Sequence, residues 1–143
     1  MAQRAGGSSM GEHENERVVQ EMYAAFGRGD IPGVLDQLAD DIEWRIAGPS
    51  ELPYAGLHRG RDEVAKFFET FGQVSEFEMF EAQEYFSRGD KVVVLGHERQ
   101  RVKATGHVVE TEWAMVFTLR AGKIARYHNF VDTHALAVAH RGS

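Results

Sequence analysis

One aspartate near the C-terminus, Asp132, ends a stretch whose residue types are suited to chemistry. The two-residue period of a β-strand places Arg126, His128, Phe130 and Asp132 on one face of a predicted strand. If this face points inward, a carboxylate lies at the end of a row of imidazole and aromatic groups. Such a row is typical of a lined pocket with a polar floor rather than of a solid core. The alternative is that Asp132 is a turn cap or a salt-bridge partner.

A second candidate, Arg99, lies in the predicted strand 92–102. The alternation of this strand groups five residues on one face: Val93, Leu95, His97, Arg99 and Arg101. Either this row leaves the core at Arg99 and is solvated, or Arg99 is buried and needs a carboxylate partner, because an unpaired interior charge is costly. Asp132 is the natural partner. Such a pair would hold the carboxylate ionised and oriented as a general base.

Other chemistries are not indicated by the sequence. The seven histidines show no HxH or HxxxH spacing, so we predict no metal site. Nucleophilic catalysis is not predicted, because the chain has no cysteine and no serine in a strand-to-helix elbow. Gly27, Gly29 and Gly33 follow a predicted helix rather than a strand, which is the wrong context for a dinucleotide-binding loop. We therefore expect a site without a cofactor.

Length and charge narrow the class of protein. A chain of 143 residues is most simply one domain with room for a core and a modest cavity. Sixteen basic and 22 acidic residues give a formal charge of -6, so neither nucleic acid nor an anionic membrane is an expected partner. No apolar run approaches the roughly 20 residues that span a bilayer. The N-terminus lacks a secretory h-region, and we expect a cytoplasmic protein.

The elements that must position these residues follow from periodicity. Residues 1–14 are small and polar and are predicted to be a flexible tail; residues 15–139 form the domain, and 140–143 a second tail. Helical spacing begins near Val18, a short helix follows the cap Asp30, and a third helix starts at Arg61. Strands are predicted at 42–46, 77–86, 92–102, 113–119 and 124–131, with a loop at 48–60 that is a candidate rim or lid.

The last two strands form the clearest pair in the sequence. Trp113, Met115, Phe117 and Leu119 alternate with smaller residues, and a turn containing Gly122 joins them to the return strand, so we predict an antiparallel hairpin. Three helices followed by a run of antiparallel strands indicate an α+β fold in which a curved sheet wraps around a long helix.

Several strings in this order resemble one family. The sequences VVQEMYAAFGRGD, DDIEWRIAG, PYAGLHRGRDEVAKFF and FTLRAGKIARYHNFVDTHAL are similar to the SnoaL-like branch of the nuclear transport factor 2-like (NTF2-like) superfamily. The resemblance covers about residues 15–139. It implies a cone in which a curved, mostly antiparallel sheet and three N-terminal helices enclose a deep apolar pocket, and it implies homodimers. Activities in this superfamily include steroid isomerisation, polyketide cyclisation and epoxide hydrolysis.

The resemblance also implies roles for particular residues. The polyketide cyclases and limonene epoxide hydrolases have an aspartate at the end of the last strand, which falls here on Asp132. The epoxide hydrolases also use an arginine, which falls on Arg99. Arg101 occupies the place of their second aspartate. Trp44 and Ile46 replace their water-positioning tyrosine and asparagine, so the residues depart from the epoxide hydrolase pattern.

These observations lead to one hypothesis and one alternative. The hypothesis is a homodimer that binds a small hydrophobic molecule and acts as a cofactor-independent isomerase or cyclase, with Asp132 as general acid or base oriented by Arg99; epoxide hydrolysis is a further possibility. The alternative is a non-catalytic ligand-binding or dimerisation domain in which Arg99 and Asp132 are a structural pair. In either case the predicted pocket is lined by Trp44, Tyr54, His97, Trp113, His128 and Phe130.

Overall fold

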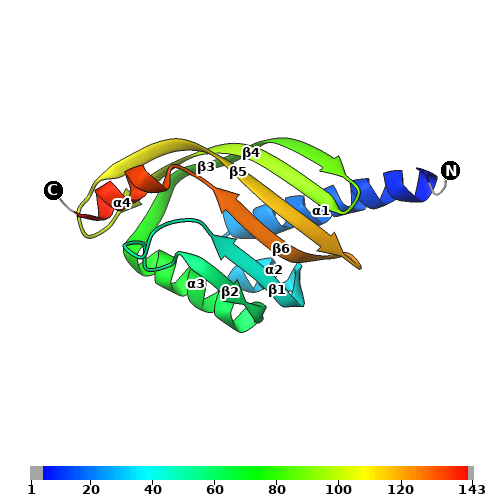
Figure 1. The fold of residues 1–143 in the computed structure, drawn as a ribbon, viewed down its shortest axis with the longest axis horizontal. Helices are drawn as coiled ribbons and strands as arrows, with labels where there is room; N and C mark the ends of the chain where they lie inside the picture. The colour runs from blue at the N-terminus through cyan, green and yellow to red at the C-terminus, as the bar shows by residue number, and fades with distance from the viewer. Residues whose placement is uncertain (1–4, 142–143) are drawn as a thin grey trace.

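The structure, a computed structural model, describes residues 5–141 and has six strands and four helices within that range (Figure 1). In chain order these are α1 (Ala5–Gly27), α2 (Ile31–Asp36), β1 (Leu38–Ile46), β2 (Gly56–Arg59), α3 (Gly60–Val74), β3 (Ser75–Arg88), β4 (Lys91–Val102), β5 (Val108–Arg120), β6 (Lys123–Phe130) and α4 (Thr133–Arg141). The predicted α+β class is confirmed.

The six strands form one curved, unclosed sheet in the order β2-β1-β6-β5-β4-β3. All neighbouring strands are antiparallel except β1 and β6, which run parallel, so the sheet is mixed. Figure 1 shows α1, α2 and α3 on one side of the curved sheet and α4 at the end of the molecule where the chain finishes. The predicted curved, mostly antiparallel sheet with three helices on one side is confirmed in this arrangement.

Local sequence explains the second and third helices. The side chain of Asp30 caps α2 by accepting a hydrogen bond from the Gly33 amide at 2.9 Å, and proline lies in the first turn of that helix. The first turn of α3 carries Asp62 and Glu63, which are favourable at the positive end of the helix dipole. Its apolar stripe packs inward, with Val64 and Phe67 buried.

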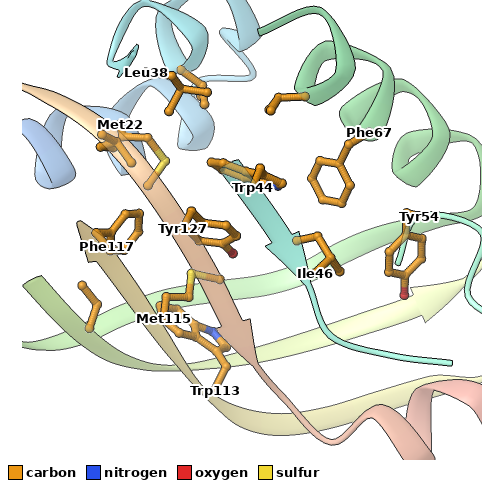
Figure 2. Packing of buried hydrophobic residues seen from close by; sticks show 14 of the residues in the cluster. Met22, Leu38, Trp44, Ile46, Tyr54, Phe67, Trp113, Met115, Phe117 and Tyr127 are labelled. Carbon is orange, nitrogen blue, oxygen red and sulfur yellow. The ribbon is translucent and has the colours of Figure 1, made fainter. Parts of the chain in front are cut away.

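The predicted hairpin of β5 and β6 is confirmed. Ala121 and Gly122 connect the strands with φ angles of 51° and 79°, as a two-residue turn that follows the sheet twist requires. On β5, the four predicted core residues are all buried: Trp113, Met115, Phe117 and Leu119. Figure 2 shows three of them, Trp113, Met115 and Phe117, in the cluster with residues of α1, α3 and β1.

Three predicted boundaries differ from the structure. Residues 5–14 belong to α1 rather than to a tail, and the side chain of Glu12 accepts a hydrogen bond from the Gly89 amide at 2.7 Å, which ties this part of α1 to the β3–β4 turn. Part of the predicted loop 48–60 forms β2, because it pairs with β1. At the other end, α4 continues to Arg141, which pairs with Glu51. Residues 1–4 and 142–143 lie outside the described part of the chain.

Gly96, on the inward face of β4, is fixed by a close approach. A Cβ atom at this position would lie 2.2 Å from Cζ2 of Trp113 and 2.3 Å from the carbonyl oxygen of Glu81. The indole of Trp113 therefore packs directly over the backbone of β4, and only glycine leaves room for it.

We expect Gly96→Ala to destabilise the fold by about 1–3 kcal/mol, because the indole and a backbone carbonyl would both have to move. The matched control is Gly72→Ala in α3, where nothing lies within 4 Å of the added methyl group and the change should be neutral or stabilising by up to about 1 kcal/mol. Urea denaturation of both variants measures the difference. Equal midpoints would show that Trp113 does not need the glycine.

Candidate functional site

A cavity lies between the helices and the inner face of the sheet, and its volume is about 80 Å³. One water needs roughly 10–15 Å³, so there is room for several waters or a compact molecule. The wall is mostly aromatic and aliphatic. Its apolar members come from α1, β1, α3, β3, β5, α4 and the residues just after β1 and β6: Met22, Phe26, Ile46, Ala47, Phe67, Phe68, Phe71, Phe77, Phe80, Met115, Val131 and Leu136. Such a wall suits a hydrophobic ligand.

Glu98 is the ionisable carboxylic acid in this wall. It lies on the inward face of β4 because that strand alternates strictly, with Val94 and Val102 buried on the same face. The residue is 5% exposed, and its side chain has no hydrogen-bond partner or salt bridge among residues 5–141. Burial raises the pKa of Glu98 to about 7, with nearby His97 lowering it in part. The group can therefore gain or lose a proton near neutral pH.

Three phenols line the same cavity, and one of them, Tyr23, donates its hydroxyl hydrogen to Met115 Sδ at 3.0 Å. The other two are Tyr127 and Tyr54. Tyr127 is buried and stacks on Trp44 with ring centroids 3.9 Å apart. Figure 2 labels both side chains. Burial and the charge of Glu98 raise the pKa of Tyr127 far above neutrality. Burial raises the pKa of Tyr54 to about 12; a hydrogen bond from Gln100 lowers it in part, and the charge of Glu98 adds to the rise. Tyr127 and Tyr54 therefore stay protonated at neutral pH and keep a hydrogen to donate.

Amide side chains complete the polar part of the wall. Gln100 lies two residues after Glu98 on the same face and is 1% exposed. Its Nε2 donates to Ser75 Oγ at 3.0 Å and to Tyr54 Oη at 3.3 Å. Asn129 lines the cavity from β6, and its Oδ1 accepts a hydrogen bond from the Ala47 amide at 2.8 Å. The cavity thus combines an apolar wall with a few fixed polar groups.

Three of the predicted lining residues are buried in the interior. Trp44 and Tyr54 line the cavity, as predicted. Trp113 is buried, but it is not in the cavity wall. Its ring stacks on that of Phe80, which does line the cavity, with ring centroids 4.9 Å apart.

The predicted pair of Arg99 and Asp132 is not present. Arg99 points to the outer face of β4, where it forms a salt bridge with Glu110 at 3.2 Å, and His97 hydrogen-bonds to the same carboxylate at 2.8 Å. The hydrogen bonds from His97 and Arg99 lower the pKa of Glu110. The sequence left open whether Arg99 is solvated or buried with a partner. Arg99 is solvated, because the opposite face of β4 carries the core residues.

The predicted inward face of the last strand is also wrong. Tyr127 points inward, and Arg126, His128 and Phe130 lie on the outer face. Asp132 is exposed beyond the strand and caps α4, since its Oδ1 accepts a hydrogen bond from the Ala135 amide at 3.0 Å. A one-residue change in phase exchanges the two faces of a strand, which explains both errors. The catalytic role of Asp132 stays a prediction.

Sequence reasoning missed Glu98, Gln100 and Tyr127. A signal for the first two was present, because Val92, Val94 and Val102 share their phase in the strand. Three buried valines at even positions, with glycine at 96, favour an inward even face more than the mixed row at odd positions does.

Neither a metal site nor a membrane-spanning helix is found in the described chain. Within residues 5–141 no group of three or more histidine and acidic side chains is placed to hold a metal ion. No helix of this range has the length and apolar character needed to cross a membrane.

Comparison with known proteins decides the family. Residues 19–127 match the family profile described as a SnoaL-like domain. The chain belongs to the SnoaL-like family. The matched region contains Glu98, Gln100 and Tyr127 of the candidate site. Asn129, Val131 and Leu136 of the cavity wall follow it in the chain.

Relatives of this SnoaL-like chain include uncharacterised proteins. One from Mycobacterium tuberculosis is 27% identical over 113 residues, which are 79% of this chain and 85% of the relative. The crystal structure of an NTF2-like protein from Burkholderia xenovorans is 37% identical, has a TM-score of 0.81 and covers 90% of this chain and 96% of its own. TerC, which was co-crystallised with polyporic acid, shares the fold at 24% identity, with a TM-score of 0.81 over 90% of this chain and 98% of its own.

The raised pKa of Glu98 predicts how stability depends on pH. Because folding raises this pKa from an ordinary 4.5 to about 7, the stability from the protonated group is fully present below about pH 4 and is lost as pH rises through 7. We expect this group to remove about 2–3 kcal/mol of unfolding free energy between pH 5 and pH 8.5. Glu98→Gln should lack this loss and be more stable than wild type at pH 8.5.

Urea denaturation of wild type and Glu98→Gln across this pH range measures the effect. The difference between the two curves cancels the other titrating groups, which both proteins share. Parallel curves would mean that Glu98 keeps an ordinary pKa in the fold.

Proposed function

We propose that this SnoaL-like protein is a cofactor-independent enzyme that moves a proton on a carbon next to a carbonyl group of a small hydrophobic molecule. The observation that carries the proposal is Glu98, a buried carboxyl with a pKa of about 7 in an apolar cavity. A general base works best when its pKa is near the operating pH. A carboxyl with a cation beside it would be ionised but would be a much weaker base.

The proposed step starts from ionised Glu98. One carboxylate oxygen takes the proton from the carbon, the electrons of that C–H bond form a carbon–carbon double bond, and the carbonyl oxygen becomes an enolate oxygen. Tyr127 is the candidate donor to that oxygen, because it lines the cavity, stays protonated and is close enough to Glu98 for the carboxylate charge to affect its pKa.

Two outcomes follow from the enolate. If the ketone carries a neighbouring C=C bond, the enolate is a dienolate. Return of the proton from Glu98 to the far (γ) carbon then moves the double bond, and the reaction is an isomerisation. If the enolate carbon attacks a second carbonyl carbon of the same molecule, a ring closes and the new alkoxide takes the proton, which is an aldol-type cyclisation. Neither the isomerisation nor the cyclisation needs a cofactor, because each returns the proton that Glu98 took. Membership of the SnoaL-like family supports this class of reaction. The co-crystal of TerC with polyporic acid supports a small organic molecule as the ligand.

The test is hydrogen–deuterium exchange in 2-indanone, a compact ketone with acidic hydrogens on both sides of its carbonyl. We expect wild type to accelerate exchange in D₂O, and Glu98→Gln to lower the rate constant by about 10²-fold or more, which is the range for loss of a general base. Because the base must be ionised, the rate should rise with pH to a plateau with a midpoint near 7. NMR of the ketone measures the exchange.

Asp132→Asn is the matched control for this experiment. It removes a carboxylate that caps α4 outside the cavity, and asparagine is also a good cap, so exchange should continue at the wild-type rate. Loss of exchange in Asp132→Asn with normal exchange in Glu98→Gln would transfer the role of base to Asp132. Tight binding of a ketone with no exchange by wild type would favour a non-catalytic binding protein.

The outer face of the sheet supports a second part of the proposal, a homodimer. In the register of the sheet, Leu95, Ala114 and Phe130 lie directly opposite one another, and Phe86 is opposite Val93 in the next row. Leu95 is 37% exposed, Phe130 47% and Phe86 53%. We call these five residues the outer apolar patch. Exposed apolar patches of this kind mark interaction sites.

Charges on either side of the outer apolar patch fit a second copy of the same chain. Arg45, Lys91 and Arg126, together with Glu43, line one depression that reaches Phe130, so basic side chains outnumber acidic ones there. Glu84 and Glu112 line a second depression that also reaches Phe130. A two-fold axis through the patch would bring the basic side of one copy to the acidic side of the other.

Phe130→Glu should therefore convert a dimer into a monomer, because it puts a charge into the centre of an apolar contact. Light scattering after size-exclusion chromatography measures the mass, which should fall by half. The control is Val138→Glu, at an exposed apolar residue of α4 away from the sheet face, and it should keep the wild-type mass. A monomeric wild type would refute this part of the proposal.

A further inference from the structure

Gln100 is a buried amide whose nitrogen forms hydrogen bonds within the protein and whose oxygen forms none with the described residues. It is 1% exposed and lines the cavity. Both hydrogens of its Nε2 are used, one toward Ser75 and one toward Tyr54. Its Oε1 receives no hydrogen bond from any residue between 5 and 141. Because Gln100 lines the cavity, this oxygen is an acceptor at the cavity wall without a protein donor, which makes it a candidate for contact with a ligand.

Tyr54 supplies the complementary group beside it. Its oxygen accepts the hydrogen bond from Gln100, so its own hydrogen is directed elsewhere. The described part of the chain offers that hydrogen no acceptor. The cavity wall therefore presents an unused acceptor and an unused donor next to each other. A hydroxyl group, which donates one hydrogen bond and accepts others, satisfies both at once.

The identity of this group does not depend on which way the amide of Gln100 is turned. In the opposite orientation, the hydroxyls of Ser75 and Tyr54 would donate to the amide oxygen, and the NH₂ group would face the cavity. A ligand hydroxyl would then accept from that NH₂ group. A ligand group without polar atoms would leave the amide unsatisfied in both orientations.

The position of this amide relative to Glu98 sets where the hydroxyl lies on the ligand. Glu98 and Gln100 are two residues apart on one face of β4, which corresponds to about 6.5–7 Å along a strand. A ring system with the reacting carbonyl at one end and a hydroxyl at the opposite end has a comparable span. The phenylalanines of α3 and β3 that line the cavity suit the flat faces of such a ring.

We propose that the substrate is a hydroxylated aromatic ketone, whose hydroxyl group binds between Gln100 and Tyr54 while its carbonyl lies at Glu98. This inference rests on the proposed function and specifies its substrate class. Gln100 and Tyr54 are then specificity residues, which position the ligand and take no part in proton transfer.

A matched pair of ligands, 2-indanone and 5-hydroxy-2-indanone, tests the inference by calorimetry. The two compounds differ by one hydroxyl at the end of the ring system away from the carbonyl. Wild type should bind the hydroxylated ketone about 10-fold more tightly, the usual effect of one satisfied buried hydrogen bond. Gln100→Leu should bring the two affinities within about 2-fold, through weaker binding of the hydroxylated ketone alone.

A second test variant and a control variant accompany Gln100→Leu. Tyr54→Phe removes only the hydroxyl and should also reduce the preference, so it replaces Gln100→Leu if that variant does not fold. Gln83→Leu makes the same replacement at an exposed glutamine of β3 and should keep the 10-fold preference.

The outcomes separate this inference from the proposed function. Equal affinity of wild type for the two ketones, with exchange that still depends on Glu98, would overturn the hydroxyl site alone. Preference for the hydroxylated ketone without any exchange would uphold the hydroxyl site and refute the enzyme. Failure of both ketones to bind would overturn both.

Discussion

The structure depends on the alternation of one interior strand. Because β4 is paired on both edges, every second side chain must enter the space between the sheet and the helices. At Val92, Val94 and Val102 this geometry supplies core packing. At Glu98 and Gln100 it forces a carboxyl and an amide into the same apolar space. Burial of an unpaired charge is costly, so the carboxyl retains its proton up to about pH 7, and this retention is what makes it a useful base.

Neighbouring elements adapt to the same strand. Gly96 lets the indole of Trp113 pack flat over the β4 backbone, which closes the core on one side of Glu98. On β6, Tyr127 stacks on Trp44 and brings a phenol from the adjacent part of the sheet toward the carboxyl. Ser75, at the start of β3, and Tyr54, before β2, hold the amide of Gln100. The polar groups of the cavity thus come from separate segments but are arranged around two residues of one strand.

The sequence predicted the fold well and the site only in part, for a physical reason that differs between strands. On β1 the apolar Ile42, Trp44 and Ile46 alternate with charged residues, so the phase is unambiguous and Trp44 was placed correctly. On β4 both phases begin with aliphatic residues and continue with polar ones, so the first half of the strand does not say which face is buried. Only Val102 and Gly96 favour the even face.

The last strand adds a second source of error. Aromatic residues occur in both phases of β6, and the register with β5 shifts between Thr118 and Leu119. Tyr127 and His128 are therefore equally plausible inward residues until the bulge is known. A residue that follows the strand, such as Asp132, gives even less information, because its position depends on how α4 begins.

The distribution of ion pairs explains why the interior carboxyl can act as a base. Arg99 and Arg126 have their carboxylate partners, Glu110 and Glu43, on the outer face of the sheet. Exposed pairs of this kind contribute little to stability, but they keep cations away from the cavity. A guanidinium beside Glu98 would lower its pKa and stabilise the ionised form. The fold thus forgoes that stabilisation, and the carboxyl keeps a pKa near neutral, as the proposed reaction requires.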